Sequence, residues 1–474
     1  MGMKRRDILK LGAAGVAVAA ASTVTGCSGS SESSSEATGA QQGKLLGKHK
    51  VIVIGAGFGG LTVAKQLKKA DKSFDVLVIE KNDTFMSCPF SNTNLGKLKG
   101  INLGTFIYDY AQPVEKHGYG MLKAEVTGID RKAKLVHTTQ GSVAYELLVL
   151  SPGIAYNYEG QFPKWSKEKI KHIQRVAPGA LIPGSEHVVL ERNLSNMEDG
   201  DVIITVPSSG KYRCPPAPFE RACMIAAYMK KEEIEGKVII LNETGAIAKG
   251  AAFKEAWKEL YGNRIEHHAN CKLDDVDPKS KKIMYTQTVG TGKKDAEGDE
   301  VTKKVSKSMN YEVLNLIAHN KANPVIEMAG LETTKDGFGK VKMAGCSFAT
   351  KTDPDVYAVG DVVGHAIPPS GQTANWAGNQ CAAEIAHRLH GKDYTLPVKS
   401  ATAEKPIQAA NVCFSMVGDN PEEGIMVSHD FSWTGTVIKG KGHVPKGADG
   451  KFRSRGTAKA TRDWYRGIMS DLFS

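Results

Sequence analysis

Apolar residues along this chain gather in short continuous runs that alternate with segments of helical spacing. The runs Lys50–Ile54, Asp75–Ile79, Asp201–Val206 and Lys237–Leu241 are rich in valine and isoleucine, which predicts strands buried on both faces. The segment LTVAKQLKKA after the first run places its apolar residues on one face of a helix. Repeated alternation of such strands and helices predicts an α/β protein whose sheets are mostly parallel.

The first 26 residues have the pattern of an export signal. The pair Arg5-Arg6 is followed by the weakly apolar stretch LGAAGVAVAAAS, and Val24–Cys27 has the form of a lipobox. An amphipathic first helix is disfavoured because the stretch has no polar stripe. The apolar run Leu11–Ala21 is also shorter than the ~20 residues that span a bilayer. We expect export to the periplasm by the twin-arginine route, with Cys27 a candidate for a lipid anchor.

Composition narrows the class of protein. The chain has 474 residues with 41% hydrophobic residues, which is material for two or three domains. Its formal net charge is +11, of which Lys4, Arg5, Arg6, Lys10 and Asp7 supply +3, so +8 remains after the signal. A surplus of this size does not demand a polyanion, and we expect no nucleic acid partner.

A glycine-rich turn follows the first strand directly. Gly55 allows a tight turn, Gly57 lets backbone approach a pyrophosphate, and Gly60 lets helix and strand pack closely. Glu80 ends the second strand, twenty residues after Gly60, where a carboxylate can accept hydrogen bonds from a ribose. Strand, glycines, helix and acid in this register predict a dinucleotide site. A tight turn with no ligand is the alternative.

Two later segments distinguish FAD from NAD. Glu146–Gly153 is a predicted strand that ends in a small-residue turn, and Val356–Asp361 is one that ends in Gly-Asp. Both resemble the segments with which two-dinucleotide flavoproteins close their FAD site. Gly153 and Asp361 are therefore expected at the cofactor, with the aspartate turned toward the ribitol chain, and FAD is the expected cofactor.

No second nucleotide is expected in the middle of the chain. The strand Asp201–Val206 runs into Pro207–Pro216, which lacks a G-x-G-x-x-G motif and holds prolines where phosphates would need free N–H groups. The next strand, Lys237–Leu241, indicates that the fold continues without its ligand. We expect that electrons do not come from NAD(P)H.

The eight cysteines show neither a C-x-x-C pair nor a Cys/His metal spacing. No metal site and no haem attachment within this chain are therefore expected. Cys223 and Cys381 lie in alanine-rich helical segments, and Cys271 and Cys346 lie in no motif. We expect these four to be structural, because a buried free cysteine is usually a small hydrophobe.

Three further cysteines lie in distinctive contexts. Cys88 stands in the loop FMSCPFSN, Cys214 begins the run CPPAPFERA, and Cys413 lies in NVCFS. With these segments, with WKELYG, and with DWY and DLF near the C-terminus, the chain resembles the flavoprotein subunit of flavocytochrome c sulfide dehydrogenase over nearly its whole mature length. The proline-rich run at Cys214 is specific to that family, whereas the glycine motif is shared by many.

The resemblance implies a glutathione-reductase-like flavoprotein with two dinucleotide-binding domains and a C-terminal interface domain. It implies FAD bonded covalently through Cys88, a disulfide between Cys214 and Cys413 beside the flavin, and a separate c-type cytochrome subunit. Hydrosulfide would attack that disulfide, giving a persulfide and a thiolate whose electron pair passes to the flavin. A packed loop thiol and an inert structural disulfide are the alternatives for these cysteines.

Glu220, six residues after Cys214, is open to two interpretations. In one, its carboxylate takes the proton of hydrosulfide or of the persulfide. In the other, it stabilises the N-terminus of the helix that begins near Phe219. Both fit the sequence.

We expect a signal at 1–26, a Ser-rich tether at 27–46, an FAD-binding domain at 47–160 and 326–398, a nucleotide-like middle domain at 161–325, and an interface domain at 399–474. Residues 287–306 predict a charged hairpin inserted in the middle domain. Residues 439–462 are Gly-rich and basic, which is typical of a solvated loop, with anionic lipid or an acidic partner face as alternative contacts. Ala318–Asn320 lacks the proline of the family segment near the flavin.

The leading hypothesis is a periplasmic sulfide dehydrogenase flavoprotein. It would oxidise hydrosulfide to sulfur or polysulfide through the disulfide and FAD, and pass electrons to a c-type cytochrome. One alternative is a sulfide:quinone oxidoreductase, a class that reaches quinone through apolar C-terminal helices, for which only Trp464–Phe473 is available here. The other is a non-enzymatic flavin or persulfide accessory subunit.

Overall fold

The computed structural model of the chain describes residues 44–394, 396 and 411–474. These residues belong to one compact unit, 42–474. The predicted signal, Cys27 and most of the predicted tether lie outside the described residues.

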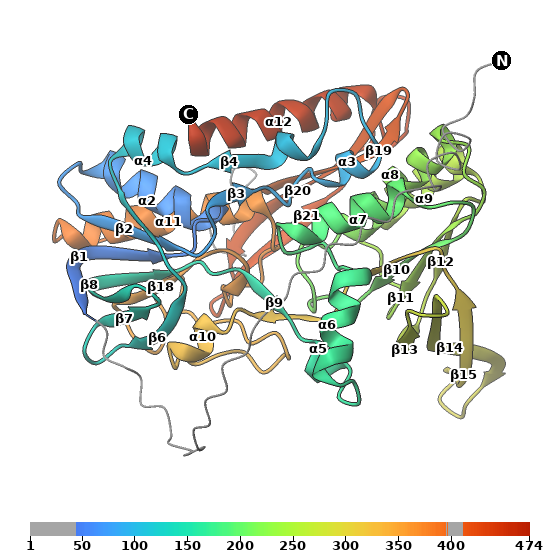
Figure 1. Cartoon of the computed structure of the whole chain (residues 1–474), viewed down its shortest axis with the longest axis horizontal. Helices are drawn as coiled ribbons and strands as arrows, with labels where there is room; N and C mark the ends of the chain where they lie inside the picture. Colours follow the sequence, from blue (N-terminus) through green and yellow to red (C-terminus); the bar gives the residue numbers. More distant parts are fainter. Residues whose placement is uncertain (1–43, 395, 397–410) are drawn as a thin grey trace, which may run out of the picture. The chain divides into compact units, whose positions relative to one another are not determined.

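A seven-stranded sheet builds the first part of the chain (Figure 1). In spatial order its strands are β5 (Gly120–Lys123), β2 (Val76–Glu80), β1 (Leu45–Ile54), β8 (Gly141–Leu150), β7 (Leu135–Thr138) and β6 (Val126–Asp130), with β18 (Val356–Ala358) paired to β8. Strands β5, β2, β1, β8 and β18 run parallel. Their carboxyl ends therefore meet at one edge of the sheet, which is where parallel α/β sheets bind ligands.

Strand β1 begins at Leu45, two residues inside the segment predicted as tether. The reason is that β8 extends back to Gly141, so Leu45 finds a backbone partner in Ser142 although its own side chain is exposed. Alternation of apolar and polar side chains could not show this extension.

A second, four-stranded sheet carries the middle of the chain. Its strands, all parallel, are β12 (Ile265–His268), β11 (Val238–Asn242), β10 (Val202–Val206) and β16 (Val313–Leu316). The runs predicted as buried strands thus form the centres of the two sheets. The α/β class is confirmed, with a first sheet that is mostly parallel and a second sheet that is parallel throughout.

Helices cover these sheets, and α2 and α11 lie side by side over the first one (Figure 1). The longer helices are α2 (Phe58–Ala70), α6 (Lys167–Val176), α7 (Ser185–Ser195), α8 (Ala217–Lys231) and α11 (Gly371–Leu389). The shorter ones are α3 (Asn92–Leu95), η1 (Leu103–Phe106), α4 (Ala111–His117), α5 (Tyr158–Gln161), α9 (Gly250–Ala256), η2 (Trp257–Tyr261), α10 (Val325–Met328) and η3 (Gly360–Val362).

Two short strand pairs complete this part of the fold. Strands β9 (Ile154–Tyr156) and β17 (Asn320–Ala322) pair antiparallel where the chain passes between the two sheets in each direction. Strands β3 (Thr84–Met86) and β4 (Ile107–Asp109) pair next to the loop that holds Cys88.

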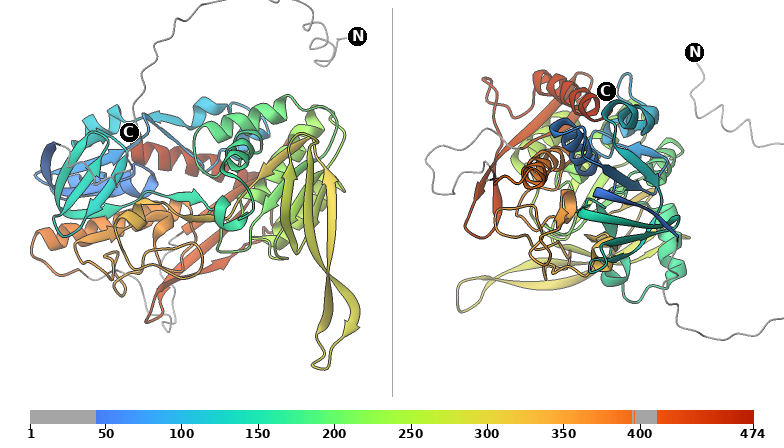
Figure 2. Two further views of the ribbon diagram at one scale, coloured as in Figure 1. Left: turned by 60° about the horizontal axis from the view of Figure 1, so that its bottom comes forward. Right: turned by 90° about the vertical axis from the view of Figure 1, so that its left-hand side faces the viewer.

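The predicted hairpin insertion is present. Strands β14 (Lys282–Lys294) and β15 (Glu300–Asn310) pair antiparallel, and β13 (Cys271–Asp277) pairs with β14. Ile283 and Tyr285 are buried at the base of this sheet. Its distal half is exposed and projects from the rest of the middle part of the chain (Figure 2).

The C-terminal residues form an antiparallel sheet and a helix. The strands are β19 (Asn411–Asp419), β20 (Glu422–Trp433) and β21 (Ile438–His443), followed by α12 (Arg455–Phe473). Helix α12 packs on β20, and its Phe473 ring stacks on Tyr108 of β4 with centroids 4.8 Å apart. In the part of the chain that the structure describes, no helix is both long and apolar enough to cross a membrane.

The interpretation of residues 439–462 as a solvated basic loop holds only in part, because many of these residues are exposed but others lie in a strand and a helix. The segment contains β21 and the start of α12, and carboxylates of the same chain pair with four of its basic groups. These pairs are Lys451 with Glu259, Arg453 with Glu255, Glu259 and Glu423, Lys459 with Asp463, and Arg462 with Glu422.

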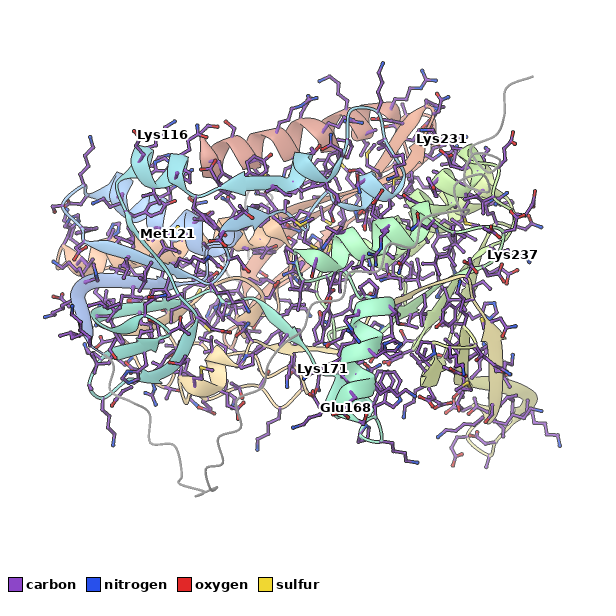
Figure 3. The ribbon with its side chains drawn as sticks, viewed as in Figure 1. Lys116, Met121, Glu168, Lys171, Lys231 and Lys237 are labelled. Carbon is purple, nitrogen blue, oxygen red and sulfur yellow. The ribbon has the colours of Figure 1, made fainter. Side chains whose placement is uncertain are left out.

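Positive charge elsewhere is spread over several elements. Figure 3 labels Lys116 of α4, Lys171 of α6, Lys231 of α8 and Lys237 just before β11. Three of these lysines lie on separate helices, and Lys237 is paired with Glu266.

Candidate active site

A cavity of about 1020 Å³ lies at the carboxyl edge of the first sheet. Most of the predicted site residues line it: Gly55, Gly57, Glu80, Cys88, Gly153, Cys214 and Asp361. Gly60, Glu220 and Cys413 are not among its lining residues. Its volume is at the upper end of the range for small-molecule sites, as a dinucleotide requires.

The three fingerprint glycines differ in what surrounds them. A Cβ at Gly55, whose φ is +96°, would lie 2.3 Å from the Ser151 carbonyl oxygen, and one at Gly60 would lie 1.9 Å from the Gly55 carbonyl oxygen. A Cβ at Gly57 would meet no protein atom within 4 Å, although Gly57 lines the cavity. Gly55 and Gly60 thus serve the turn itself, and Gly57 leaves space at the N-terminus of α2 for a phosphate.

Glu80 fixes the loop beside that turn. Its Oε2 accepts the Ala56 N–H at 2.9 Å, and its Oε1 accepts the N–H groups of Lys81 and Asn82 at 3.0 and 2.9 Å. These bonds hold the carboxylate on the cavity wall, in the position a ribose would need. The residues present therefore fit FAD.

Asp361, which also lines the cavity, forms an ion pair that sequence reasoning missed. Arg213 Nη1 lies 3.1 Å from Asp361 Oδ2, and the Arg213 side chain is only 16% exposed. Burial opposes the charge of Arg213, but the neighbouring Cys88 and then Asp361 outweigh it and raise its pKa. The position of Arg213, next to the motif cysteine Cys214, is the one signal that could have marked it.

Cys88 lies in the loop between β3 and α3, where its Sγ donates to the Leu181 carbonyl oxygen at 3.6 Å. Ser91 Oγ and the Ser91 N–H both donate to the Cys88 carbonyl oxygen, at 2.7 and 3.1 Å. The thiol is therefore held at the cavity wall by a locally fixed turn, within reach of a ligand there.

Cys214 precedes α8 with a left-handed backbone of φ 53°, a strained conformation of the kind that gathers at functional sites. Its N–H donates to the Pro369 carbonyl oxygen at 3.0 Å. Burial raises the pKa of the Cys214 thiol, and Cys413, Cys88 and Glu220 raise it further. The cavity wall thus favours neutral sulfur at this position.

Strand β19, which carries Cys413, packs against α8, the helix that follows Cys214, and the charge of Cys413 raises the pKa of the Cys214 thiol. Lys249 Nζ donates to the Cys413 carbonyl oxygen at 2.9 Å and so ties β19 to the middle of the chain. Both cysteines are free thiols in the structure, and their disulfide stays a prediction.

Glu220 lies in the first turn of α8 and joins three elements. Its Oε2 accepts Asn92 Nδ2 of α3 at 2.9 Å, and its Oε1 accepts the Met416 N–H of β19 at 2.7 Å. Burial raises the pKa of its carboxyl. Both oxygens are thus engaged in holding α8 against the strand of Cys413, while the proton-handling role stays a prediction.

Tyr156 and Glu186 also line the cavity, and no motif in the sequence predicted them. The Tyr156 hydroxyl donates to Glu186 Oε2 at 2.7 Å and accepts the N–H groups of Leu181 and Ile182 at 3.0 and 3.2 Å. The Ala180 N–H also donates to Glu186 Oε2, at 2.7 Å. This pair fixes the loop whose carbonyl receives the Cys88 thiol.

In the second sheet, the loop after β10 is closed by side chains of the chain itself. Glu243 follows β11 as Glu80 ends β2, and its Oε2 accepts the Ser208 N–H at 2.9 Å. His319 Nε2 lies 2.6 Å from Glu243 Oε1. The acid of a nucleotide site is present, but unlike Glu80 it is paired with a histidine, and its loop lacks the glycine turn.

The remaining predicted structural cysteines differ in burial. Cys223, Cys271 and Cys381 are buried and Cys346 is partly exposed. Burial raises the pKa of Cys271 to about 11, so this thiol is unreactive near neutral pH. Within residues 44–394 and 411–474, no group of three or more His, Cys, Asp or Glu side chains could hold a metal ion.

Three family descriptions match separate parts of the chain. Residues 49–177, which hold the glycine turn and Cys88, match pyridine nucleotide-disulphide oxidoreductases. Residues 187–296, which hold Cys214, match the central part of the sulfide dehydrogenase (flavocytochrome c) flavoprotein chain. Residues 405–473, which hold Cys413, match the flavin-binding part of flavocytochrome c sulphide dehydrogenase.

Individual relatives are distant. The chain is 23% identical to coenzyme A disulfide reductase of Staphylococcus aureus over 387 residues, which is 79% of this chain and 78% of the relative. The sulfide:quinone oxidoreductase of Aquifex aeolicus superposes with a TM-score of 0.63 at 17% identity, covering 90% of this chain and 91% of that one. The reduced CoADR-RHD of Bacillus anthracis gives 0.57 at 14% identity, covering 91% and 75%. These structures show the same fold.

Proposed function

Because the chain carries the central and flavin-binding regions of the sulfide dehydrogenase flavoprotein, we propose that this FAD-binding oxidoreductase oxidises hydrosulfide at a Cys214–Cys413 disulfide and passes the electrons to a separate c-type cytochrome. The observation that carries the proposal is the position of Cys214 in the cavity wall, with β19, the strand of Cys413, packed on the helix that follows Cys214. The proposed location is the periplasm, on the strength of the signal pattern in residues 1–26.

The chemistry starts with hydrosulfide as nucleophile. Its sulfur attacks one sulfur of the disulfide, the S–S bond breaks, and the products are one persulfide and one cysteine thiolate. Hydrosulfide in total gives up two electrons and one proton and leaves sulfur in the zero oxidation state. Bound FAD supplies an acceptor that takes electrons in pairs and releases them singly.

The surroundings of Cys214 support this assignment. A thiolate left there is disfavoured, because burial and the neighbouring Cys413 raise the pKa of Cys214. A cysteine whose charged form is costly is well placed to pass its electron pair on to an acceptor in the same cavity.

The C-terminal helix supports a cytochrome as electron acceptor over a quinone. The apolar side of α12, with Tyr465, Ile468, Met469, Leu472 and Phe473, is buried against the protein. A helix whose apolar side is already covered is a poor membrane contact. The helix begins at Arg455, so it is also longer than the predicted Trp464–Phe473.

Replacing the two cysteines tests the proposal. Cys214→Ser and Cys413→Ser should each keep FAD but lose sulfide-dependent cytochrome c reduction by at least about 100-fold, because either change removes the same bridge. The double variant should lose no more than either single one. Anaerobic stopped-flow absorbance at the flavin band measures the reduction of FAD by sulfide.

Matched controls are Cys271→Ser and Cys346→Ser, which lie outside the cavity and should stay within about twofold of wild type. NADH should leave the flavin oxidised. Near-normal sulfide turnover in either single variant, or faster transfer to a quinone than to cytochrome c, would contradict the proposal.

A further inference from the structure

One end of the cavity holds a cluster of groups that sulfide oxidation does not use. The Cys88 cluster consists of Cys88, Arg213, Tyr156 and Glu186, all of which line the cavity. Cys88 contacts the Leu181 carbonyl, while Tyr156 and Glu186 bind the adjoining N–H groups of the same loop. A nucleophile, a fixed cation and a carboxyl group are thereby held together by a strand, a helix and two loops.

Five carboxylates of the described residues line the cavity: Glu80, Asp83, Glu125, Glu186 and Asp361. The first three lie near the glycine turn, where the Ala124 N–H donates to the Glu80 carbonyl oxygen at 2.9 Å. Asp361 is paired with Arg213. Glu186 is the one whose hydrogen bonds tie it to the loop that contacts Cys88.

We propose that the Cys88 cluster is a self-sufficient flavin-attachment site, in which Glu186 is the base that removes a proton from the 8α methyl group of bound FAD and Cys88 is the nucleophile that bonds to that carbon. Arg213 supplies positive charge beside the attacking sulfur. The assignment rests on the proposed function only in requiring FAD in this cavity and a covalent bond at Cys88.

The step balances as follows. One C–H bond of the methyl group and the S–H bond of Cys88 break, and one C–S bond forms. Two protons leave, and two electrons pass to the flavin ring. The first proton goes to Glu186 and the second to solvent. The electron pair remains on the flavin ring until a one-electron acceptor such as a c-type cytochrome removes it.

Burial raises the pKa of Glu186, which brings this carboxyl closer to neutral pH and makes it a stronger base. The groups that face it are Tyr156 of β9, Tyr158 of α5, His187 of α7 and Arg221 of α8. The hydrogen bonds that Tyr156 and the Ala180 N–H donate, and the charge of Arg221, act in the opposite direction and lower the pKa, whereas His187 is uncharged near neutral pH. Only the deprotonated form accepts a proton, so attachment should accelerate as pH rises through the pKa of Glu186.

One substitution distinguishes a purely structural role of Glu186, in which it acts as a clamp that holds the loop through hydrogen bonds, from a role as a base. Both hydrogen bonds to Glu186 end on Oε2, and an amide oxygen accepts both equally well. Glu186→Gln therefore keeps the clamp and removes the base.

The test uses the full chain prepared without flavin, mixed with FAD and cytochrome c. Covalent FAD is measured over time as colour retained after acid precipitation and as the mass of the intact protein. Glu186→Gln should bind FAD reversibly with an affinity within about threefold of wild type, but attach it roughly 100-fold more slowly and without the rise with pH. Glu186→Asp should recover part of the rate together with its pH dependence.

The matched control is Glu191→Gln on the same helix, which lies outside the cavity and should attach FAD as wild type does. Attachment by Glu186→Gln at the wild-type rate and pH profile would overturn the role of Glu186 while leaving the Cys88 bond intact. Covalent FAD on Cys88→Ser, or none on wild type, would instead refute the bond to Cys88. Sulfide oxidation with FAD bound reversibly would still support the proposed function.

Discussion

Gly57 and Gly60 lie in one turn, but an added methyl group would meet different surroundings. At Gly60 it would overlap the Gly55 carbonyl oxygen, at 1.9 Å, so the turn must move. Gly60→Ala should lower the free energy of unfolding by about 1–3 kcal/mol. At Gly57 the methyl enters the cavity, so Gly57→Ala should keep the stability of wild type and weaken reversible FAD binding by roughly tenfold, or about 1.4 kcal/mol.

Urea unfolding of the flavin-free protein and FAD titration measure the two quantities separately. Both variants should be made in the Cys88→Ser background, where binding stays reversible. Gly100, with φ +74° and no atom within 4 Å of an added Cβ, is exposed and lies outside the cavity, so Gly100→Asn is the control. Equal losses of stability at Gly57 and Gly60 would show that Gly57 does not face a ligand.

At the scale of elements, Arg453 holds the C-terminal sheet to the middle of the chain. The Arg453 side chain is 7% exposed, and its guanidinium contacts Glu423 of β20 at 2.7 Å, Glu255 of α9 at 3.2 Å and Glu259 of η2 at 2.6 Å. Removing the cation leaves Glu255 and Glu423 unpaired in partly buried positions. Arg453→Met should lower the free energy of unfolding by roughly 2–4 kcal/mol, because the partly buried carboxylates lose their positively charged partner.

Chemical denaturation measures that cost, with the exposed Arg455→Met as control at no more than about 0.5 kcal/mol. Because Cys413 lies on β19 of the same sheet, the Arg453 variant should also lose sulfide oxidation before it loses FAD as urea is raised. Simultaneous loss of both would indicate that the sheet does not loosen independently.

At the scale of the whole molecule, two buried histidines make stability depend on pH. Burial lowers the pKa of His187 to about 3 and of His365 to about 4. The His187 ring nitrogens have no hydrogen-bond partner among the described residues, and His365 Nδ1 accepts the Ile438 N–H at 3.3 Å. The unfolded chain binds protons at both rings below about pH 6.5, whereas the folded chain does not, so stability is lost as pH falls from there toward pH 4.

Each ring contributes up to about 1.4 kcal/mol per pH unit over that interval. Between pH 6.5 and 4, the free energy of unfolding of His187→Leu should therefore fall less steeply than that of wild type. The difference in slope should correspond to the uptake of about one proton on unfolding. The exposed His443→Gln is the matched control and should follow the wild-type slope. Parallel slopes for His187→Leu and wild type would mean that His187 is protonated in the folded protein.

Features whose signals lie within a short stretch of chain could be predicted from the amino-acid sequence alone. The strand, the glycine turn, the helix and Glu80 follow one another directly, and each carries its own pattern of apolar spacing or backbone freedom. The α/β class and the cavity residues Gly55, Gly57, Glu80, Gly153 and Asp361 were predictable, because parallel strands bring their carboxyl ends to one edge. The proline-rich motif around Cys214 also identified this segment as part of the site without information on its spatial neighbours.

Which residues meet across long stretches of chain depends on how the elements pack. The strand of Cys413 packs on the helix that follows Cys214, Arg213 pairs with Asp361, and Glu186 joins Tyr156 at the loop of Cys88, although no spacing in the chain connects them. The same limit explains why the sequence did not predict the ion pairs of Lys451, Arg453 and Arg462 with carboxylates on β20, α9 and η2. Hydrophobic periodicity fixes which face of an element is buried, but the partners of a polar group depend on how separate elements pack, and that packing brings together residues far apart in the chain.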